Sequence, residues 1–459
     1  MNSEQIIVAK FGGTSMKDKE AMERSASVAI KHQARFCVVS ATSGTTNSLL
    51  EIVTRSKNGD IEGSKEIVQE LKIKHLQIAE DLNLSLEAMS AINVILEELL
   101  HLVQGIYFLK EVSPKASDRL QSIGERVSSI LFSKAMENQL SKNNLPSVVE
   151  TIDARLYLKT DSNFTKAKPD IEKIKLSCGP LKNKILNSPY QFFVTQGFIG
   201  SNKEGHTTTL GRGGSDYSAS IFGEALNANE IQIWTDVPGI ATTDPRICND
   251  AKIIPELSFK EAAEMATFGA KILHPTTVLP AKRGNIPVFV GSSYEPDQPG
   301  TKIKKTVNEK PLVRSINLRK NQTLITISNP RMLNAHGFLA NIFETFKRHD
   351  VSVDAITTSE ISVAMTVNTH DLEDKSILQE LEIFGKVSKE DQLSIVSIIG
   401  NKINHTSGLA NSIFQALGDI NVRMICQGAS LHNFCFLVTE EEGPMAVSSL
   451  HSAFITKVN

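Results

Sequence analysis

The sequence predicts an α/β protein in which a mostly parallel sheet, covered by helices on both faces, is followed by two smaller α+β units. Three observations lead to this prediction. Short apolar strands alternate with helical patterns over roughly the first 290 residues. A segment rich in Pro, Gly, Asp and Lys, 294–311, then interrupts the pattern. Beyond it, two stretches match each other at a constant offset of 71 residues.

The first part of the chain predicts repeated strand–helix–strand units. Residues 6–10 form an apolar strand, apolar residues then recur at helical spacing, and 36–40 form a second strand. We expect a three-layer α/β/α domain, because such buried strands need helices on both faces of their sheet. Helical periodicity over 61–140 predicts a helical excursion on the substrate side. Further strands are predicted at 191–195, 231–235 and 286–290, each followed by Gly or Pro.

The second part of the chain contains an internal repeat. Residues 323–367 align with 394–438 without a gap, which places Gly337 on Gly408. Each copy predicts a β-α-β-β unit too small to cover both faces of its sheet, so we expect the copies to pair with each other or with another subunit. A duplicated unit without a ligand is the alternative. The predicted domains are 1–295, 312–388 and 389–459. A strand from 296–320 is a candidate to be shared with the last domain.

Composition and charge exclude several classes of protein. A formal net charge of −2 leaves no global field for nucleic acid or an anionic membrane, so small molecules are the expected partners. Five scattered cysteines without a C-x-x-C pair fit neither a disulfide framework nor a zinc site, and they predict a reducing cytoplasm. The N-terminus lacks a basic region, and no run of about 18 apolar residues occurs, so neither secretion nor a membrane span is expected.

A phosphate cradle is predicted where the first strand ends. Lys10 closes that strand and is followed by Gly12 and Gly13 before the first helix. Glycines let the backbone approach a phosphate closely, and a helix N-terminus offers free N–H groups and a positive dipole end. The Walker A spacing is absent, and a purely structural Gly-Gly turn is the alternative.

A second glycine-rich loop carries charged residues. Arg212 lies between glycines in TLGRGGSDY, and Asp216 follows near the start of a helix. A buried guanidinium between glycines suits bidentate recognition of a carboxylate. Asp216 also has a simpler interpretation, since an acidic residue in the first turn of a helix stabilises the helix dipole.

Several polar side chains are expected to meet at one edge of the sheet. The carboxyl ends of the parallel strands carry Lys10, Ser40, Thr195 and Asp236, and ligands of open α/β sheets bind at that edge. Lys271 lies in a small apolar stretch, GAKIL, so its amine is a candidate to reach the same site along a buried stem. A surface lysine is the alternative.

Six motifs in order, spanning essentially the whole chain, resemble the signature of aspartokinases within the amino acid kinase family. They are KFGGTS, SGTTN, TLGRGGSDY, WTDVPG, TTDPR and FGAKILHP, and the repeat resembles a tandem pair of ACT domains. The first repeat, with TISNPRMLNAHGFLANIF and VSVDAITTSEISVA, is most similar to lysine-sensitive aspartokinases of type III. The resemblance implies an amino acid kinase domain followed by two ferredoxin-like ACT domains.

The same resemblance implies the activity and its partners. The reaction would convert ATP and L-aspartate to ADP and 4-phospho-L-aspartate, the first step toward lysine, threonine and methionine. ATP and Mg²⁺ would be the cofactors, and L-lysine would inhibit through the ACT domains. A cytoplasmic homodimer formed through the ACT domains, or a tetramer, is implied.

The resemblance further implies roles for individual residues. Lys10 and Lys271 would neutralise the transferring phosphoryl group, with Asp216 orienting the lysine beside it and Gly12 and Gly13 assisting. Arg212 would bind the α-carboxylate of aspartate and Glu125 its α-ammonium group. Thr46 and Phe198 would line the pocket. ATP would be contacted by Lys10, Ser40, Thr235, Asp236, Ala241, Arg246 and Lys271. Lysine would be held by Met332, Phe338, Leu339, Ser352, Val353, Asp354, Ser359 and Glu360. No protein ligands to a metal are implied.

Two positions depart from the family pattern. Ala241 stands where relatives commonly have Tyr, which removes an aromatic or hydroxyl contact to the nucleotide, and Ile123 stands where relatives often have His. Neither departure removes a charge that the chemistry needs. Two other functions are the alternatives. A kinase of glutamate or N-acetylglutamate would share the phosphate-binding motifs but normally lacks the repeat pair. A catalytically silent amino-acid sensor would keep the repeat pair, but the intact lysines and Arg212 argue against it.

Overall fold

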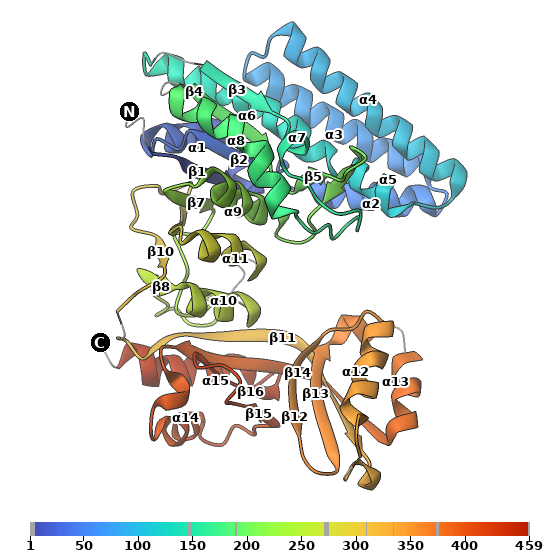
Figure 1. Cartoon of the computed structure of the whole chain (residues 1–459), viewed down its shortest axis with the longest axis vertical. Helices are drawn as coiled ribbons and strands as arrows, with labels where there is room; N and C mark the ends of the chain where they lie inside the picture. The colour runs from blue at the N-terminus through green and yellow to red at the C-terminus, as the bar shows by residue number, and fades with distance from the viewer. Residues whose placement is uncertain are drawn as a thin grey trace. The chain divides into compact units, whose positions relative to one another are not determined.

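The computed structural model describes residues 5–145, 148–188, 191–269, 275–308, 310–333, 335–372 and 376–457. The chain forms two compact units (Figure 1). Unit 1 comprises 1–240, 255–259 and 272–306, and unit 2 comprises 241–254, 260–271 and 307–459. The predicted boundaries at 295, 312 and 388 instead leave 241–254 and 260–271 with the first domain, and those boundaries stay predictions.

Unit 1 contains the predicted mostly parallel sheet. Its strand order is β3-β4-β2-β1-β7-β9-β10-β8, and every pair is parallel except β9 with β10. The predicted α/β fold class is therefore confirmed. The strands are β1 (Ile7–Phe11), β2 (Phe36–Val39), β3 (Val148–Ile152), β4 (Gln191–Gln196), β7 (Glu230–Thr235), β8 (Glu256–Ser258), β9 (Val288–Ser292) and β10 (Thr301–Lys304).

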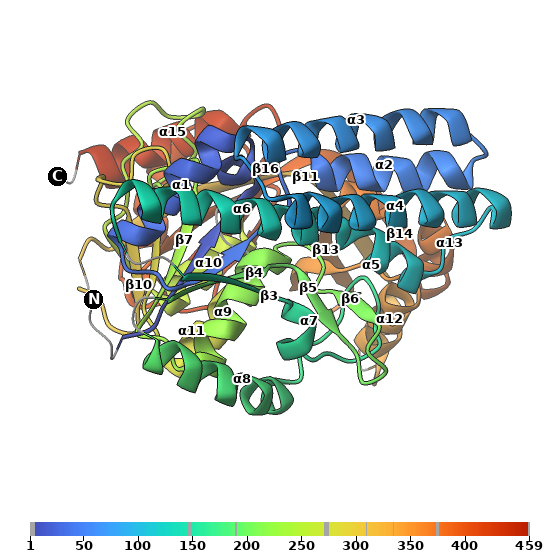
Figure 2. The same cartoon turned by 90° about the horizontal axis from the view of Figure 1, so that it is seen from above.

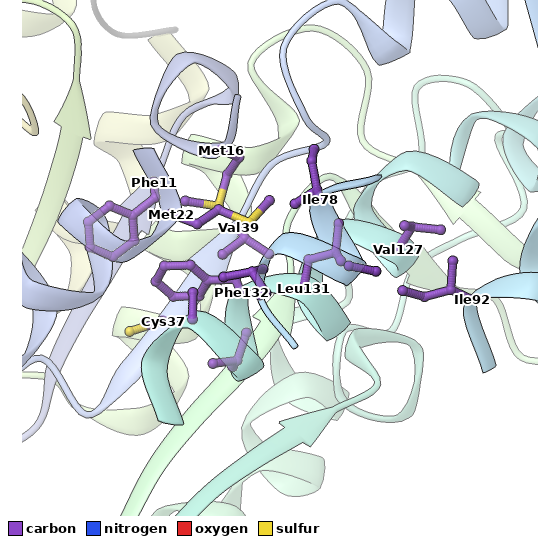
Figure 3. Close-up of a cluster of buried hydrophobic side chains, with 14 of the residues drawn as sticks. Phe11, Met16, Met22, Cys37, Val39, Ile78, Ile92, Val127, Leu131 and Phe132 are labelled. Carbon is purple, nitrogen blue, oxygen red and sulfur yellow. The ribbon is translucent and has the colours of Figure 1, made fainter. Parts of the chain in front are cut away.

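Helices cover both faces of this sheet, as the apolar strands require. One face carries α1 (Lys19–Lys31) and α6 (Ile123–Lys142), and the other carries α8 (Ile171–Asn187), α9 (Gly214–Leu226) and α11 (Pro275–Gly284) (Figure 2). A large cluster of buried hydrophobic side chains lies between the sheet and α6 (Figure 3), where the rings of Phe11 and Phe132 are 5.4 Å apart. Because side chains alternate along a strand, Lys10 points to the opposite face, toward α9.

The predicted helical excursion over 61–140 consists of α3 (Ile61–Asp81), α4 (Leu86–Leu109), α5 (Pro114–Gln121) and most of α6. A further helix, α2 (Thr45–Lys57), precedes it. Among the described residues, α4 alone is long and apolar enough to cross a membrane. It packs against α2, α3 and α6, and its Glu98 ion-pairs with Arg119 and Arg126 at 2.5 and 2.8 Å. These contacts place α4 in the helical layer of unit 1.

Unit 2 is built around one antiparallel sheet of order β12-β13-β11-β14-β16-β15. The internal repeat is confirmed, since each copy supplies a strand, a helix and two further strands, followed by another helix. The first copy comprises β11 (Val313–Ser328), α12 (Phe338–Arg348), β12 (Val353–Thr358), β13 (Ser362–Asn368) and α13 (Ser376–Leu381). The second comprises β14 (Lys386–Gly400), α14 (Leu409–Leu417), β15 (Met424–Cys426), β16 (Asn433–Thr439) and α15 (Gly443–His451).

The two copies share their long central strands. The first half of β11 pairs with the second half of β14, and Val313 and Ile316 pack in the core of the second copy. The second half of β11 pairs with the first half of β14, and Ile325 and Ile327 pack in the core of the first copy. The first half of β11, which precedes the first repeat, therefore completes the sheet and core of the second.

Candidate active site

The carboxyl end of β1 carries a buried ion pair. Lys10 Nζ lies 2.5 Å from Asp216 Oδ1, and both side chains are largely shielded from water. Asp216 belongs to the first turn of α9, which packs on the face of the sheet toward which Lys10 points. Asp216 is thus more than a stabiliser of the helix dipole, because it holds an ammonium group at the edge of the sheet where ligands of this architecture bind.

The glycine turn after β1 differs in one respect from the predicted phosphate cradle. It leads into a short 3-10 turn, Gly13–Met16, and α1 begins only at Lys19, capped by Asp18. The N–H of Gly12 donates to the carbonyl of Trp234 at 3.2 Å, so this donor is committed to the backbone of β7. The Gly12 N–H is therefore not available to a phosphate, and the 3-10 turn offers less of a helix dipole at this point than the sequence predicted.

The loop 41–46 lies beside this turn and opens α2. Its backbone is held from α3, where Lys74 Nζ donates to Ser43 O at 2.6 Å. His75, which is buried, lies with Nε2 3.0 Å from Thr42 Oγ1 and Nδ1 2.7 Å from Leu71 O. Burial lowers the pKa of His75 to about 4, so the ring is neutral near pH 7. Neither residue was predicted, because the sequence shows only an amphipathic helix there.

Glu125 emerges in the first turn of α6 against the same loop. A Cβ on the preceding Gly124 would lie 2.7 Å from Ala41 Cβ, so only glycine lets α6 approach this closely. Glu125 is buried, and burial raises its pKa to about 8, although a backbone hydrogen bond from Ala41 lowers it in part. Its Oε2 has no hydrogen-bond partner among the described residues. A buried carboxylate with a vacant acceptor suits a cationic ligand group.

Phe198 and Arg212 flank the start of α9 from the hairpin β5 (Ile199–Ser201) and β6 (Thr207–Thr209). Phe198 has φ +67°, and its N–H donates to Ser218 Oγ at 2.9 Å. A bulky residue with positive φ is uncommon and is concentrated at functional sites. Arg212 was expected to be buried, but it is exposed at the tip of a turn whose flanking glycines both have positive φ. No described residue pairs with its guanidinium.

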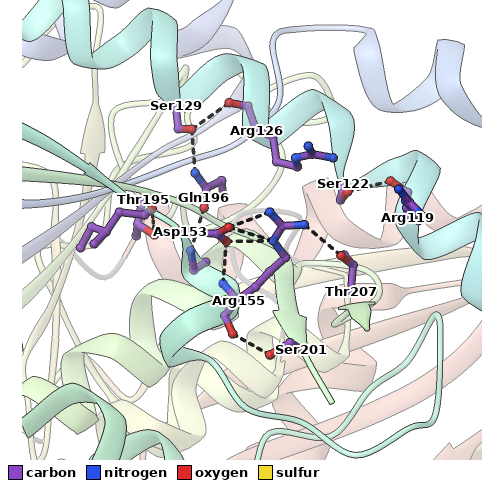
Figure 4. Close-up of polar contacts among 12 residues, drawn as sticks. Arg119, Ser122, Arg126, Ser129, Asp153, Arg155, Thr195, Gln196, Ser201 and Thr207 are labelled. Carbon is purple, nitrogen blue, oxygen red and sulfur yellow. Dashed lines mark hydrogen bonds and ion pairs between the residues drawn. The ribbon is translucent and has the colours of Figure 1, made fainter. Parts of the chain in front are cut away.

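A network of polar side chains connects α6, the end of β4 and the segment around Arg155 (Figure 4). Gln196, at the end of β4, accepts from Ala154 N at 2.8 Å and donates to Ser129 Oγ of α6 at 2.8 Å. Arg155 NH2 lies 2.6 Å from Asp153 Oδ2. Because Gln196 precedes the Phe198 turn and Ser129 shares a helix with Glu125, the network connects the segments that carry Phe198 and Glu125. Sequence reasoning missed it, since its members are far apart in the chain.

The predicted nucleotide residues divide between the two units. Ser40, Thr235 and Asp236 follow β2 and β7 at the carboxyl edge, and Thr235 Oγ1 donates to Asp236 Oδ1 at 3.1 Å. Ala241 and Arg246 belong to unit 2, where Arg246 ion-pairs with its neighbour Asp244. Lys271 lies outside the described residues. Thr195 points away from the site, because its Oγ1 donates to the carbonyl of Ile152 at 3.1 Å.

The predicted lysine-binding residues cluster in the first repeat of unit 2. They lie near the N-terminus of α12, along the start of β12 and in the turn after it, and half of them are exposed while the other half are partly buried. Asp354 is partly buried, and its Oδ2 lies 2.8 Å from a guanidinium nitrogen of Arg319. Burial raises the pKa of Asp354, and Arg319 opposes the rise. The residues are Met332, Phe338, Leu339, Ser352, Val353, Asp354, Ser359 and Glu360.

Comparisons with known proteins agree across the chain. The model of the amino acid kinase family matches residues 5–292, and an ACT domain model matches 325–374 and 396–454. The lysine-sensitive aspartokinase 3 of Escherichia coli is 43% identical over 98% of this chain and 99% of its own. The chloroplastic aspartokinase 1 of Arabidopsis thaliana is 36% identical over 97% of this chain and 80% of its own.

Solved structures give the same result. The E. coli aspartokinase III structure in complex with aspartate and ADP, described as the R-state, superposes with a TM-score of 0.87 and 42% identity, covering 98% of this chain and 99% of that one. The complex of the same enzyme with lysine and aspartate, described as the T-state, superposes with a TM-score of 0.81 at the same identity and coverage.

Proposed function

Because the chain belongs to the aspartokinases of the amino acid kinase family, we propose that the carboxyl edge of the unit 1 sheet is where it transfers a phosphoryl group. The protein is an ATP-dependent aspartate kinase, which forms ADP and 4-phospho-L-aspartate. The observation that supports the proposed location most directly is the buried pair of Lys10 and Asp216 beside the glycine turn. A silent sensor would not need this pair.

The chemistry demands charge neutralisation and positioning. The side-chain carboxylate of aspartate is already ionised near pH 7, so attack on the γ-phosphate needs no general base. Two anions must approach each other, and preorganised cations favour the transition state, where negative charge spreads over the phosphoryl oxygens. Lys10, oriented by Asp216, is one such cation, and Lys271 is proposed as the second. The N–H groups of the turn from Gly13 onward assist.

Mg²⁺ fits this site as a companion of the nucleotide. The described residues contain no group of three His, Cys, Asp or Glu side chains that could hold a metal ion. Mg²⁺ usually binds through one or two carboxylates and the substrate's phosphates, and Asp236 is a carboxylate at this edge of the sheet. When bound, the ion would neutralise phosphate charge, while Lys10 and Asp216 keep their own positions.

Aspartate recognition is assigned to the pocket between α6, the loop 41–46 and the start of α9. Glu125 would accept the α-ammonium group through its vacant Oε2, which would stabilise the ionised carboxylate that burial disfavours. Arg212 would bind the α-carboxylate as a bidentate pair. Thr46 and Phe198 would line the walls. The exposed position of Arg212 implies that its turn orders on the substrate.

Regulation is assigned to the first repeat of unit 2. L-lysine would inhibit by binding more tightly to an inactive arrangement than to the active one. Asp354 and Glu360 are the carboxylates suited to its ammonium groups. Leu339 and Phe343 form an exposed apolar stripe on α12, and Phe414 repeats it on α14, which supports a homodimer formed through these domains. A cytoplasmic location is proposed with this activity.

Release of ADP from the purified chain with MgATP and L-aspartate, with and without L-lysine, tests the whole proposal. L-glutamate serves as the control substrate. We expect aspartate-dependent turnover that lysine suppresses. Turnover that lysine does not change would refute the effector assignment alone, whereas a folded protein without turnover would refute the active site.

A further inference from the structure

Two cysteines face each other across neighbouring strands of unit 2. Cys426 of β15 and Cys435 of β16 are directly opposed in an antiparallel register. Opposed residues of an antiparallel pair have their Cα atoms about 4.5–5.5 Å apart, and disulfides bridge Cα spacings of about 4.4–6.8 Å. Their side chains also share one face of the sheet, because side chains of opposed residues point the same way. The backbone therefore places both sulfurs within bonding reach without rearrangement.

The two thiols are chemically unequal. Cys435 is buried, and its Sγ donates to the carbonyl of Cys426 at 3.5 Å, whereas Cys426 is half-buried. A hydrogen bond from the Cys435 thiol lowers the pKa of Cys426 below the usual thiol range, and the same contact raises the pKa of Cys435. Cys426 is thus the nucleophile and Cys435 the thiol that resolves it. Burial instead raises the pKa of Cys37 and Cys178.

Cys426 also lies where the two repeats touch. β12 and β15 are the two edge strands of the sheet, and they contact each other. Cys426 Sγ lies 3.7 Å from the carbonyl of Ile356 and 3.4 Å from Thr357 Oγ1, and Thr357 donates to the carbonyl of Ile425 at 3.2 Å. The strand that Cys426 contacts begins with Asp354 and leads into the turn that carries Glu360.

We propose that Cys426 and Cys435 are a redox modification site, forming a reversible disulfide on reaction with a hydroperoxide and thereby weakening inhibition by lysine. The disulfide itself follows from the register, while its effect on inhibition rests on the proposed effector site. Forming the bond commits Cys426 Sγ to β16 and removes its contacts with Ile356 and Thr357. Of the hydrogen bonds named above between the second repeat and the effector strand, only the one from Thr357 Oγ1 to the carbonyl of Ile425 then remains.

The reaction balances with the hydroperoxide as oxidant. The Cys426 thiolate attacks one peroxide oxygen, the O–O bond breaks, and the leaving oxygen departs as water after taking up a proton, which leaves a sulfenic acid on Cys426. Cys435 then attacks that sulfur, the S–S bond forms, and the hydroxyl leaves as water with the Cys435 proton. Each sulfur loses one electron and the peroxide gains two. A dithiol such as dithiothreitol reverses the change.

Peptide mapping and lysine titration of the full-length enzyme test the proposal. After treatment with hydrogen peroxide, we expect a cross-linked peptide pair containing both cysteines, lighter by two hydrogen atoms than the sum of the reduced peptides. The lysine concentration for half-maximal inhibition should rise about fivefold or more and return with dithiothreitol. Cys426→Ser should abolish the peroxide effect, and Cys435→Ser should stop at a sulfenic acid that dimedone labels on Cys426.

Cys248→Ser provides the matched control, because Cys248 is likewise part-buried and lies 3.5 Å from His451 Nδ1. That variant should respond to peroxide as the parent does. Oxidation of Cys248 without any Cys426–Cys435 cross-link would overturn the disulfide. A cross-link that leaves lysine inhibition unchanged would overturn the proposed effect of the disulfide on inhibition. If lysine never inhibits the enzyme, the effector assignment is refuted, and the peptide map still shows whether the disulfide forms.

Discussion

The two repeats of unit 2 have the same fold but opposite chemistry. Ile342 in the first repeat and Ile413 in the second are both buried, at the same position of their helices. At the offset of 71 residues, however, Asp354 corresponds to Ile425 and Glu360 to Leu431. Apolar positions therefore repeat wherever the fold needs them, whereas at these two positions only the copy proposed to bind lysine carries a carboxylate. A duplicated fold does not imply a duplicated site.

Unit 1 extends the contrast. Its proposed site includes one buried pair that is formed before any substrate binds, Lys10 with Asp216, whereas half of the proposed effector residues in unit 2 are exposed. Substitutions in unit 1 should therefore change turnover or substrate affinity. Substitutions in the first repeat should change only the response to lysine, and those in the second repeat should change neither, except where they alter the contacts of Cys426 with β12.

The largest effect is expected from Lys10→Ala. Loss of one preorganised cation at the phosphoryl group should lower kcat by about 10²-fold or more. Steady-state ADP release measures it, and Lys17→Ala, an exposed lysine in the same segment, is the matched control. A variant that folds as judged by its melting curve and keeps its kcat would remove Lys10 from the mechanism.

Arg212→Ala should act on aspartate binding. Removing the partner of a desolvated carboxylate should raise the KM for aspartate by about 10- to 100-fold, with a smaller change in the KM for ATP. Titration of each substrate at saturating levels of the other distinguishes the two. A rise confined to ATP would show that the Arg212 turn serves the nucleotide.

Asp354→Asn should weaken inhibition by lysine, because it removes a carboxylate that only the first repeat has at this position. It keeps the shape of the side chain but removes the charge, so the lysine concentration for half-maximal inhibition should rise about tenfold while kcat without lysine is unchanged. Ile425→Ala, at the equivalent position of the second repeat, should leave inhibition as it was. Equal shifts in both variants would mean that both repeats bind the effector.

The last prediction concerns pH and Glu125, and it changes the stability of the enzyme instead of its turnover or inhibition. Because the folded-state pKa is about 8 and the ordinary value is 4.5, the folded enzyme holds an extra proton between these limits. Stability of the ligand-free enzyme should therefore fall as pH rises from about 4.5 to 8, by at most about 1.4 kcal/mol per pH unit for one proton. Glu125→Gln should remove this contribution, as measured by melting temperature against pH. If the melting temperature of Glu125→Gln depends on pH as that of the parent does, the prediction is wrong.

Sequence patterns predicted the elements of unit 1 because strand and helix periods are local. Even so, the strand predicted at 286–290 lies at 288–292, and the glycine turn leads into a 3-10 turn instead of directly into α1. Such boundaries depend on which backbone groups find partners, as when Gly12 bonds to Trp234. Arg212 was correctly located in a glycine loop, but its exposure depends on the two positive φ angles beside it.

By itself, the sequence determined the fold class, the repeat and the family, because these depend on periodicity and on motifs that are contiguous in the chain. Only the tertiary structure decided which distant groups meet: Lys10 with Asp216, His75 with Thr42, Arg319 with Asp354, and Cys426 with Cys435. The physical reason is that a side chain's charge state, partners and reactivity depend on neighbours that folding brings from far along the chain, and no local pattern records them.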